Sequence, residues 1–221
     1  MHHTTATMLL GAESRGLGAE PSGALASVLA RELPTGAESL FSWASKARSA
    51  PVIYLSTPIT TGRHYLAWLR DNSDSPPDVK KRARREVYKR NIDALHGVRE
   101  QIRATYPTSL LIDPTDLSDQ PGWHQPDYHR FWSEVIASAA DAVVFADGWQ
   151  YSVGCTIEYA VALLSGKRIL DAHLRHMDTE SAWHLLEDAL DTIKAAGADD
   201  RVHRSVIELV RRKLLSESAR C

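Results

Sequence analysis

Residues 141–172 read DAVVFADGWQYSVGCTIEYAVALLSGKRILDA and contain the pattern that decides the fold. The run 141–146 is almost entirely apolar, which predicts a strand covered on both faces. A polar loop follows, and the apolar stretch 153–165 predicts a helix that leads into another strand over 166–172. A strand, a helix and a second strand in this order form the unit of a parallel sheet.

The preceding part of the chain repeats this alternation of strands and helices. VIYLS at 52–56 predicts a strand, SLLIDPTDL at 109–117 predicts a strand leaving into a loop, and helices are expected over 78–106 and 128–139. The predicted class is therefore α/β, a parallel sheet with helices on both faces. Ligands bind such sheets beyond the carboxyl ends of the strands. A site is expected among four loops, at 56–64, 112–127, 146–154 and 171–178.

Three regions are predicted along the chain. Residues 1–50 form a partly disordered extension with helices near 21–33 and 37–48, and residues 51–176 form the α/β domain. Residues 177–221 add two C-terminal helices, near 179–196 and 202–217, which we expect to pack on that domain.

Composition indicates an ordinary soluble protein. The chain has 221 residues, of which 43% are hydrophobic and 24% charged, with a net charge of −2. This balance gives no global reason to expect nucleic acid or a membrane as a partner. Cys155 and Cys221 offer no disulfide framework, which favours a reducing, cytoplasmic location. HLRH at 173–176 lacks a clear third ligand, so neither a metal nor a cofactor is expected.

Glu158 is a carboxylate in the middle of the apolar helix 153–165. Its neighbours three and four residues away are Gly154, Cys155, Val161 and Ala162, and none is a cation. An unpaired buried carboxylate is costly, so it is paired, exposed or functional. One interpretation puts it at an exposed edge or beside a distant arginine. We favour the other, in which Glu158 faces the place where the loops after the strands converge.

Two other features have two interpretations each. The loop STPITTG at 56–62 offers hydroxyls and a glycine suited to phosphate or ribose oxygens, but it is also an ordinary Thr-rich turn. The long helix carries a basic stripe interrupted by Glu86, which we interpret as a solvated face; assistance in phosphate or nucleic-acid contact is the alternative. The stripe consists of Lys80, Lys81, Arg82, Arg84, Arg85, Lys89 and Arg90.

Three stretches together resemble a known family. VIYLSTPITTG, LLIDPTDL and residues 141–170 are similar to the nucleoside 2-deoxyribosyltransferase-like superfamily, which includes nucleotide N-glycosidases and a phage and bacterial domain of unassigned activity. The resemblance covers about residues 51–171. Its most specific part falls in order and without a gap on Gly148, Trp149, Ser152, Gly154, Glu158, Tyr159, Ala162, Gly166 and Lys167. The resemblance implies a flavodoxin-like, Rossmann-like fold.

The resemblance also implies a reaction. Glu158 would attack C1′ of a nucleoside or nucleotide, the base would leave, and water or a second base would resolve the glycosyl-enzyme intermediate. Hydrolysis is the expected outcome; deoxyribosyl transfer, NAD cleavage and non-catalytic nucleotide sensing are the alternatives. Tyr54 is expected near Glu158 or in the core, Asp147 could be the general acid, and Glu134 could contact the sugar or the leaving base.

The resemblance further implies which residues bind the substrate and how the chain assembles. The expected partner is a small nucleoside or nucleotide, and a homo-oligomer, in particular a dimer, is expected. The predicted binding residues are Ser56, Thr57, Pro58, Ile59, Thr60, Gly62, Gly148, Trp149, Ser152 and Gly154.

Overall fold

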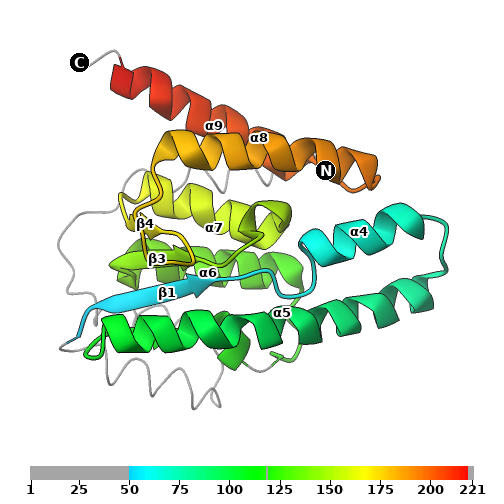
Figure 1. Cartoon of the computed structure of the whole chain (residues 1–221), viewed down its shortest axis with the longest axis horizontal. Coiled ribbons are helices and arrows are strands. Elements are labelled where there is room, and N and C mark those ends of the chain that lie inside the picture. The colour runs from blue at the N-terminus through cyan, green and yellow to red at the C-terminus, as the bar shows by residue number, and fades with distance from the viewer. Residues whose placement is uncertain (1–49, 118, 219–221) are drawn as a thin grey trace.

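Four parallel strands form one sheet in the computed structural model, which describes residues 50–117 and 119–218. Their order across the sheet is β2-β1-β3-β4 (Figure 1). This is the order of a flavodoxin-like fold, so the predicted α/β class is confirmed. The helices predicted near 21–33 and 37–48 lie outside the described residues. The strands are β1 (Val52–Ser56), β2 (Leu110–Ile112), β3 (Ala142–Phe145) and β4 (Arg168–Leu170).

The helices lie where the sequence predicted them, to within about three residues at their ends. Helix α6 begins before the predicted residue 128, because the Asp127 carboxylate accepts a hydrogen bond from the His124 N–H and stabilises the first turn. Helix α4 was not delimited from the sequence. The helices are α4 (Arg63–Asp71), α5 (Pro77–Thr105), α6 (Gln125–Ala139), α7 (Val153–Leu164), α8 (Thr179–Ala195) and α9 (Arg201–Ser218).

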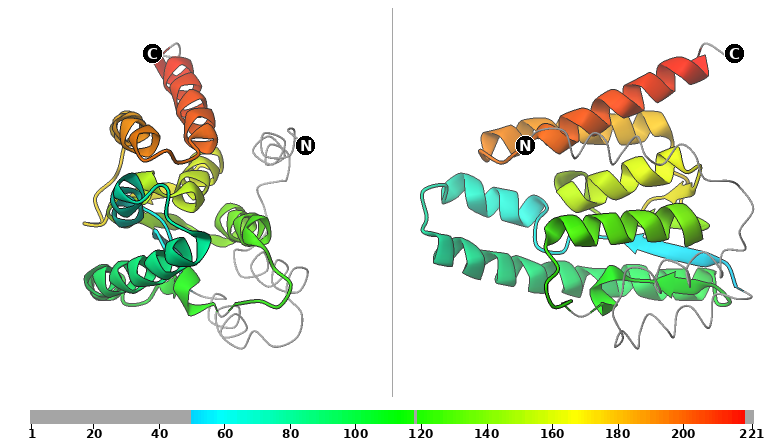
Figure 2. Two further views of the ribbon diagram at one scale, coloured as in Figure 1. Left: turned by 90° about the vertical axis from the view of Figure 1, so that its right-hand side faces the viewer. Right: turned by 180° about the vertical axis from the view of Figure 1, so that it is seen from behind.

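The sheet is covered on both faces, as its apolar strands require. Helix α5 packs Leu95 and Ile102 against Ile53 and Leu55 of β1 on one face. Helices α6 and α7 cover the other face, where Tyr54, Val143 and Phe145 meet their side chains. Figure 2 shows α6 and α7 from behind, with α8 and α9 forming a further layer above them. Side chains of these two helices, among them Leu186 and Val206, belong to the same core.

Helices α4 and α5 form a hairpin at the carboxyl end of β1. In Figure 1 this hairpin extends well beyond the arrowhead of β1. Leu66 of α4 packs on Ala189 and Ile193 of α8, which fixes one side of the hairpin to the body of the protein. None of the described helices combines the length and the apolar character that a membrane crossing needs.

Candidate active site

The loops that follow β1 and β3 leave the sheet side by side. β1 pairs with β2 on one side and with β3 on the other, so the chain connections diverge at the carboxyl ends of β1 and β3. Such a switch point is where ligands bind in open α/β sheets. The Ala146 N–H donates to the Ser56 carbonyl at 2.9 Å, and the Thr61 hydroxyl donates to the Ser152 hydroxyl at 3.2 Å. The two loops predicted to converge are therefore in contact.

Glu158 reaches this switch point from the second turn of α7. Tyr54 donates its hydroxyl to Glu158 Oε1 at 2.7 Å, and Ser56 donates its hydroxyl to Oε2 at 2.5 Å. Both donors lie on β1, two residues apart, so their side chains leave the same face of the strand. Each carboxylate oxygen therefore has a defined partner, and the carboxylate is held in one orientation.

Burial governs the protonation of Glu158. The residue retains some exposed surface, yet burial of its carboxyl group raises the pKa from the usual 4.5 to about 7. The hydrogen bonds from Ser56 and Tyr54 act in the opposite direction and favour the charged form. Burial, and then the nearby Glu158, raise the pKa of Tyr54 well above its usual value, so the phenol keeps its proton and remains a donor. Glu158 is thus poised to exchange charge near neutral pH.

Tyr54 lies both in the core and near Glu158, the two positions that the sequence allowed. Its ring is completely buried in the core and lies 5.7 Å from the ring of Trp132, while its hydroxyl emerges at Glu158. The alternation of side chains along a strand predicts the face from which a side chain leaves, but it does not predict how much of that side chain is covered by the core. The apolar ring and the polar hydroxyl of tyrosine can therefore serve both purposes.

The amino end of α7 lies beside the candidate site. Ser152 occupies the N-cap position, but its side chain does not cap the helix and instead receives the hydrogen bond from Thr61. His129 of α6 also lies at this helix end, and a Cβ at Gly154 would stand 3.6 Å from its Nε2. Burial lowers the pKa of His129, which favours the neutral ring at pH 7. No recognisable motif surrounds His129 in the sequence, so this residue was not predicted.

Asn91 of α5 holds the loop after β1 in place. Its side-chain amide donates to the carbonyls of Ile59 and Thr61, at 3.1 and 3.0 Å. Thr57 and Pro58 are buried within the same loop, and Thr60 is exposed. A single polar side chain of a helix that looks merely amphipathic in sequence therefore fixes two backbone groups of the loop.

Gly62 ends this loop and is expected to tolerate no side chain. Its φ of 95° is rarely adopted by L-residues, and an added Cβ would stand 2.9 Å from the Pro58 Cβ. We expect Gly62→Ala to lower the free energy of unfolding by about 1–3 kcal/mol. Gly97→Ala is the matched control, since Gly97 lies within α5 with nothing near its Cβ position and should stabilise by up to about 1 kcal/mol. Urea unfolding of both variants measures the difference; equal stabilities would contradict the conformational requirement at Gly62.

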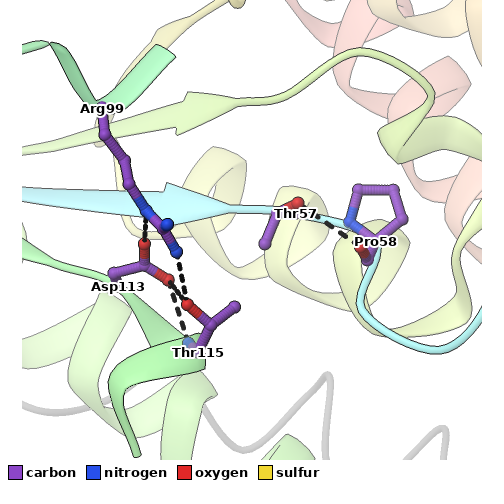
Figure 3. Close-up of polar contacts among 5 residues, drawn as sticks. All are labelled: Thr57, Pro58, Arg99, Asp113 and Thr115. Atoms are coloured by element: carbon purple, nitrogen blue, oxygen red, sulfur yellow. Dashed lines mark hydrogen bonds and ion pairs between the residues drawn. The ribbon is translucent and has the colours of Figure 1, made fainter. Parts of the chain in front are cut away.

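A buried ion pair stands at the end of β2, next to the end of β1 (Figure 3). Arg99 of α5 donates to Asp113 at 2.5 Å and to the Thr115 hydroxyl at 2.6 Å. Asp113 is 2% exposed and also accepts from the Thr115 backbone N–H at 2.9 Å. The pair fixes the loop that carries η2 (Pro114–Asp116). The sequence placed a strand end here but did not reveal the partner.

The structure moves one predicted binding residue into the core. Trp149 is 3% exposed, and its ring lies 4.8 Å from that of Tyr159 and 5.0 Å from that of Phe145. The ring therefore packs beneath the loop, and a role of Trp149 in substrate binding stays a prediction. Neighbouring Gly148 has a φ of 80° and begins the 3-10 turn η3 (Trp149–Tyr151), which explains why glycine stands there.

The two further acidic candidates lie in different surroundings. Asp147 is exposed on the loop after β3. Glu134 is half-buried on α6 and accepts a hydrogen bond from Ser138 at 3.3 Å, one turn along its own helix. Asp147 as general acid and Glu134 as a contact to the sugar or the leaving base stay predictions. Cys155 is buried, and burial raises the pKa of its thiol, in keeping with a small buried thiol.

A separate cavity of about 550 Å³ lies between β4 and helices α8 and α9. Lys167, His176 and Lys213 line it together with Asp178 and Glu180, so its charges are mixed. It includes neither Glu158 nor the loops after β1 and β3. We place the candidate site at Glu158, because the aligned hydroxyls and the perturbed carboxyl group are found there. The described residues contain no group of three or more side chains suited to holding a metal ion.

Comparison with protein-family models, with curated proteins and with solved structures finds no match for this chain. Its candidate site therefore rests on its own geometry.

Proposed function

We propose that the protein hydrolyses the N-glycosidic bond of a nucleoside or nucleotide, with Glu158 as the nucleophile. The observation that supports this most is the carboxylate itself, which lies at a switch point and is oriented by Tyr54 and Ser56 at 2.7 and 2.5 Å. A partly desolvated, fixed carboxylate suits attack on an electron-poor sugar carbon. The sequence resemblance to the nucleoside 2-deoxyribosyltransferase-like superfamily points to the same chemistry.

The reaction would proceed in two displacements. A Glu158 oxygen forms a bond to C1′ as the bond between C1′ and the base nitrogen breaks, and the base leaves with that electron pair and gains a proton. Water then attacks C1′, loses a proton, and releases the sugar and the free carboxylate. In both steps C1′ carries developing positive charge, which an adjacent carboxylate stabilises. If another base took the place of water, the same intermediate would give transfer.

The surroundings would bind the rest of the substrate. The loop 57–62, Ser152 and the amino end of α7 offer hydroxyls and backbone N–H groups suited to sugar or phosphate oxygens. Asn91 would act as a positioning residue through its two hydrogen bonds to that loop. His129 would lie close to a phosphate at the helix end. A homodimer remains part of the proposal.

The test is base release from a panel of ribo- and deoxyribonucleosides, their 5′-monophosphates and NAD, separated by chromatography. We expect free base and free sugar or sugar phosphate from at least one member of the panel. Addition of a second base tests transfer, which would give a new nucleoside. Stabilisation by a nucleotide without any turnover would reject the enzyme and favour a nucleotide sensor.

Tyr54→Phe is expected to shift the pH profile of base release. The nucleophile must be ionised, so kcat/KM should rise with pH to a plateau, with an apparent pKa near 7. The Tyr54 hydroxyl favours the carboxylate, and its loss should move this acid limb up by about one pH unit. The measurement is kcat/KM from pH 5 to 9. An acid limb that moved to lower pH would contradict the proposed ionisation of Glu158.

A further inference from the structure

The α4–α5 hairpin concentrates positive charge in an otherwise acidic chain. Residues 63–90 contain nine lysines and arginines against four aspartates and glutamates, whereas the whole chain has a net charge of −2. The hairpin therefore has a net charge of +5 and the remainder −7. Such asymmetry marks an electrostatic footprint for a polyanion.

Three cations of the basic stripe on α5 lie on the side of the helix that points away from the protein body. Ala83 and Val87 are the buried residues in this part of the helix. Lys81, Arg85 and Lys89 recur every fourth residue on the opposite side, and all three are exposed. With a rise of 1.5 Å per residue, they stand about 6 Å apart along the helix axis. This regular spacing suits the repeating charge of a phosphate backbone.

In the part of the chain that the structure describes, these three cations have no acidic side chain nearby that neutralises their charge. Within residues 50–117 and 119–218, none of these three cations takes part in an ion pair, and Glu86 is the only acidic residue from 79 to 92. Residues 1–49 contain four acidic and four basic residues, so they bring no net negative charge that could cover it. The charge is therefore available to an external partner.

Aromatic side chains stand among the cations. Tyr88 is 42% exposed and follows Arg84 by one helical turn. Arg84 lies over the ring of Tyr65, 5.0 Å from its centre, and the Tyr65 ring stacks on that of Trp68. Of these rings, Tyr88 is exposed and Trp68 is half-buried, whereas Tyr65 is buried. An exposed aromatic ring beside a basic stripe is a combination that binds single-stranded nucleic acid, with bases stacking and phosphates pairing. Exposed large apolar residues are few here, namely Val79 and Tyr88, which disfavours insertion into a membrane surface.

The hairpin is also connected to the candidate site. It begins at Arg63, whose guanidinium lies 3.4 Å from the Tyr151 hydroxyl and over its ring, next to the loop after β3. Asn91, one turn beyond Val87, holds the loop after β1. In Figure 1 the hairpin projects from the end of the sheet at which Glu158 is bound to β1. The hairpin is therefore connected to both loops that lie around Glu158.

We propose that the α4–α5 hairpin binds the phosphate backbone of single-stranded nucleic acid. This replaces the interpretation of the stripe as a merely solvated face, which rested on its interruption by Glu86. The binding does not depend on the glycosidic reaction, because it uses cations outside the Glu158 site.

The test is fluorescence anisotropy of a labelled 20-residue oligodeoxythymidine titrated with the full chain at 50–200 mM NaCl. Lys81→Gln/Arg85→Gln/Lys89→Gln is expected to weaken binding at 50 mM NaCl at least about tenfold and to reduce the salt slope by about 2. The control Arg103→Gln/Lys194→Gln/Arg211→Gln removes the same charge from exposed positions elsewhere and should bind as wild type does.

Three results would overturn this proposal. They are no binding of the oligonucleotide by wild type at 50 mM NaCl, equal weakening in both triple variants, and binding to vesicles of anionic phospholipid in place of the oligonucleotide. Circular dichroism checks that both variants remain folded. Base release from free nucleotides should be unchanged in both, so failure of this proposal and failure of the glycosidase proposal give different results.

Discussion

Glu158→Gln is expected to reduce base release by about a thousandfold or more. Glutamine keeps the shape and can still exchange hydrogen bonds with Tyr54 and Ser56, but it removes the anionic oxygen that would attack C1′. The loss should appear in kcat, because the interaction removed is one made with the reacting carbon and not with the whole substrate. Single-turnover measurement with the best substrate of the panel gives the rate. A variant that released base at the wild-type rate would exclude Glu158 as the nucleophile.

Glu187→Gln is the matched control for that loss. Glu187 lies exposed on α8. The same chemical change there should leave base release unaltered, since surface substitutions away from special features have small effects. A loss confined to Glu158→Gln would therefore reflect the position of the carboxylate and not the overall charge.

The same Glu158→Gln substitution is expected to stabilise the fold above pH 7. The pKa of Glu158 is about 7 in the folded chain against a usual 4.5, so folding favours the protonated form. Its stabilising contribution is complete below about pH 4.5 and is lost as pH rises through 7. At pH 8 the buried charge should cost about 1–3 kcal/mol, after allowance for the partial exposure of the residue.

Thermal unfolding at pH 5 and pH 8 measures this effect. Glu158→Gln should raise Tm by several degrees at pH 8 and by less at pH 5. This result would also show that lost activity does not come from misfolding, because an inactive variant would be the more stable one. A lower Tm at pH 8 would mean that the charged carboxylate stabilises the fold, contrary to the effect of burial.

Much of the fold could be predicted because local patterns determine it. The apolar run 141–146 and the β-branched run 52–56 gave strands, and the spacing of apolar residues gave the helices. The stretch 109–117 forms a strand that leaves into a loop, as predicted, and the strand is short since Pro114 starts the turn η2 immediately after Asp113. The order of strands depends on contacts between distant segments, and periodicity carries no information about it; only the family resemblance suggested it.

The candidate site was predicted where it depends on residue type and missed where it depends on packing. Glu158 stood out because its helical neighbours offer no cation, and Tyr54 was among the expected partners. Ser56 was expected to bind substrate, yet its side chain is buried and donates to Glu158. His129 lies on α6 and Asn91 on α5, and in the sequence both helices look like ordinary amphipathic segments. Their roles follow only from the way those helices are docked.

Arg99→Met is expected to lower the free energy of unfolding by about 3 kcal/mol. The variant leaves the Asp113 carboxylate 2% exposed without its cation, and removal of one partner of a buried pair typically costs about 3–5 kcal/mol. The lower end applies because Thr115 still donates twice to Asp113. Urea unfolding measures the change. Arg103→Met, one turn along α5 and exposed, is the control and should change stability by less than about 0.5 kcal/mol.

The loss of stability in Arg99→Met has two possible contributions, the isolated Asp113 carboxylate and the lost packing of the Arg99 stem. The double variant Arg99→Met/Asp113→Asn separates them. Asparagine keeps an acceptor for the Thr115 backbone N–H but carries no charge, so most of the stability lost in Arg99→Met should return. If the double variant were less stable than Arg99→Met alone, the cost would come from lost packing of the Arg99 stem and not from the isolated carboxylate. Recovery would mean that Arg99 is required mainly because Asp113 is charged, and that the pair serves to hold the loop after β2 in place.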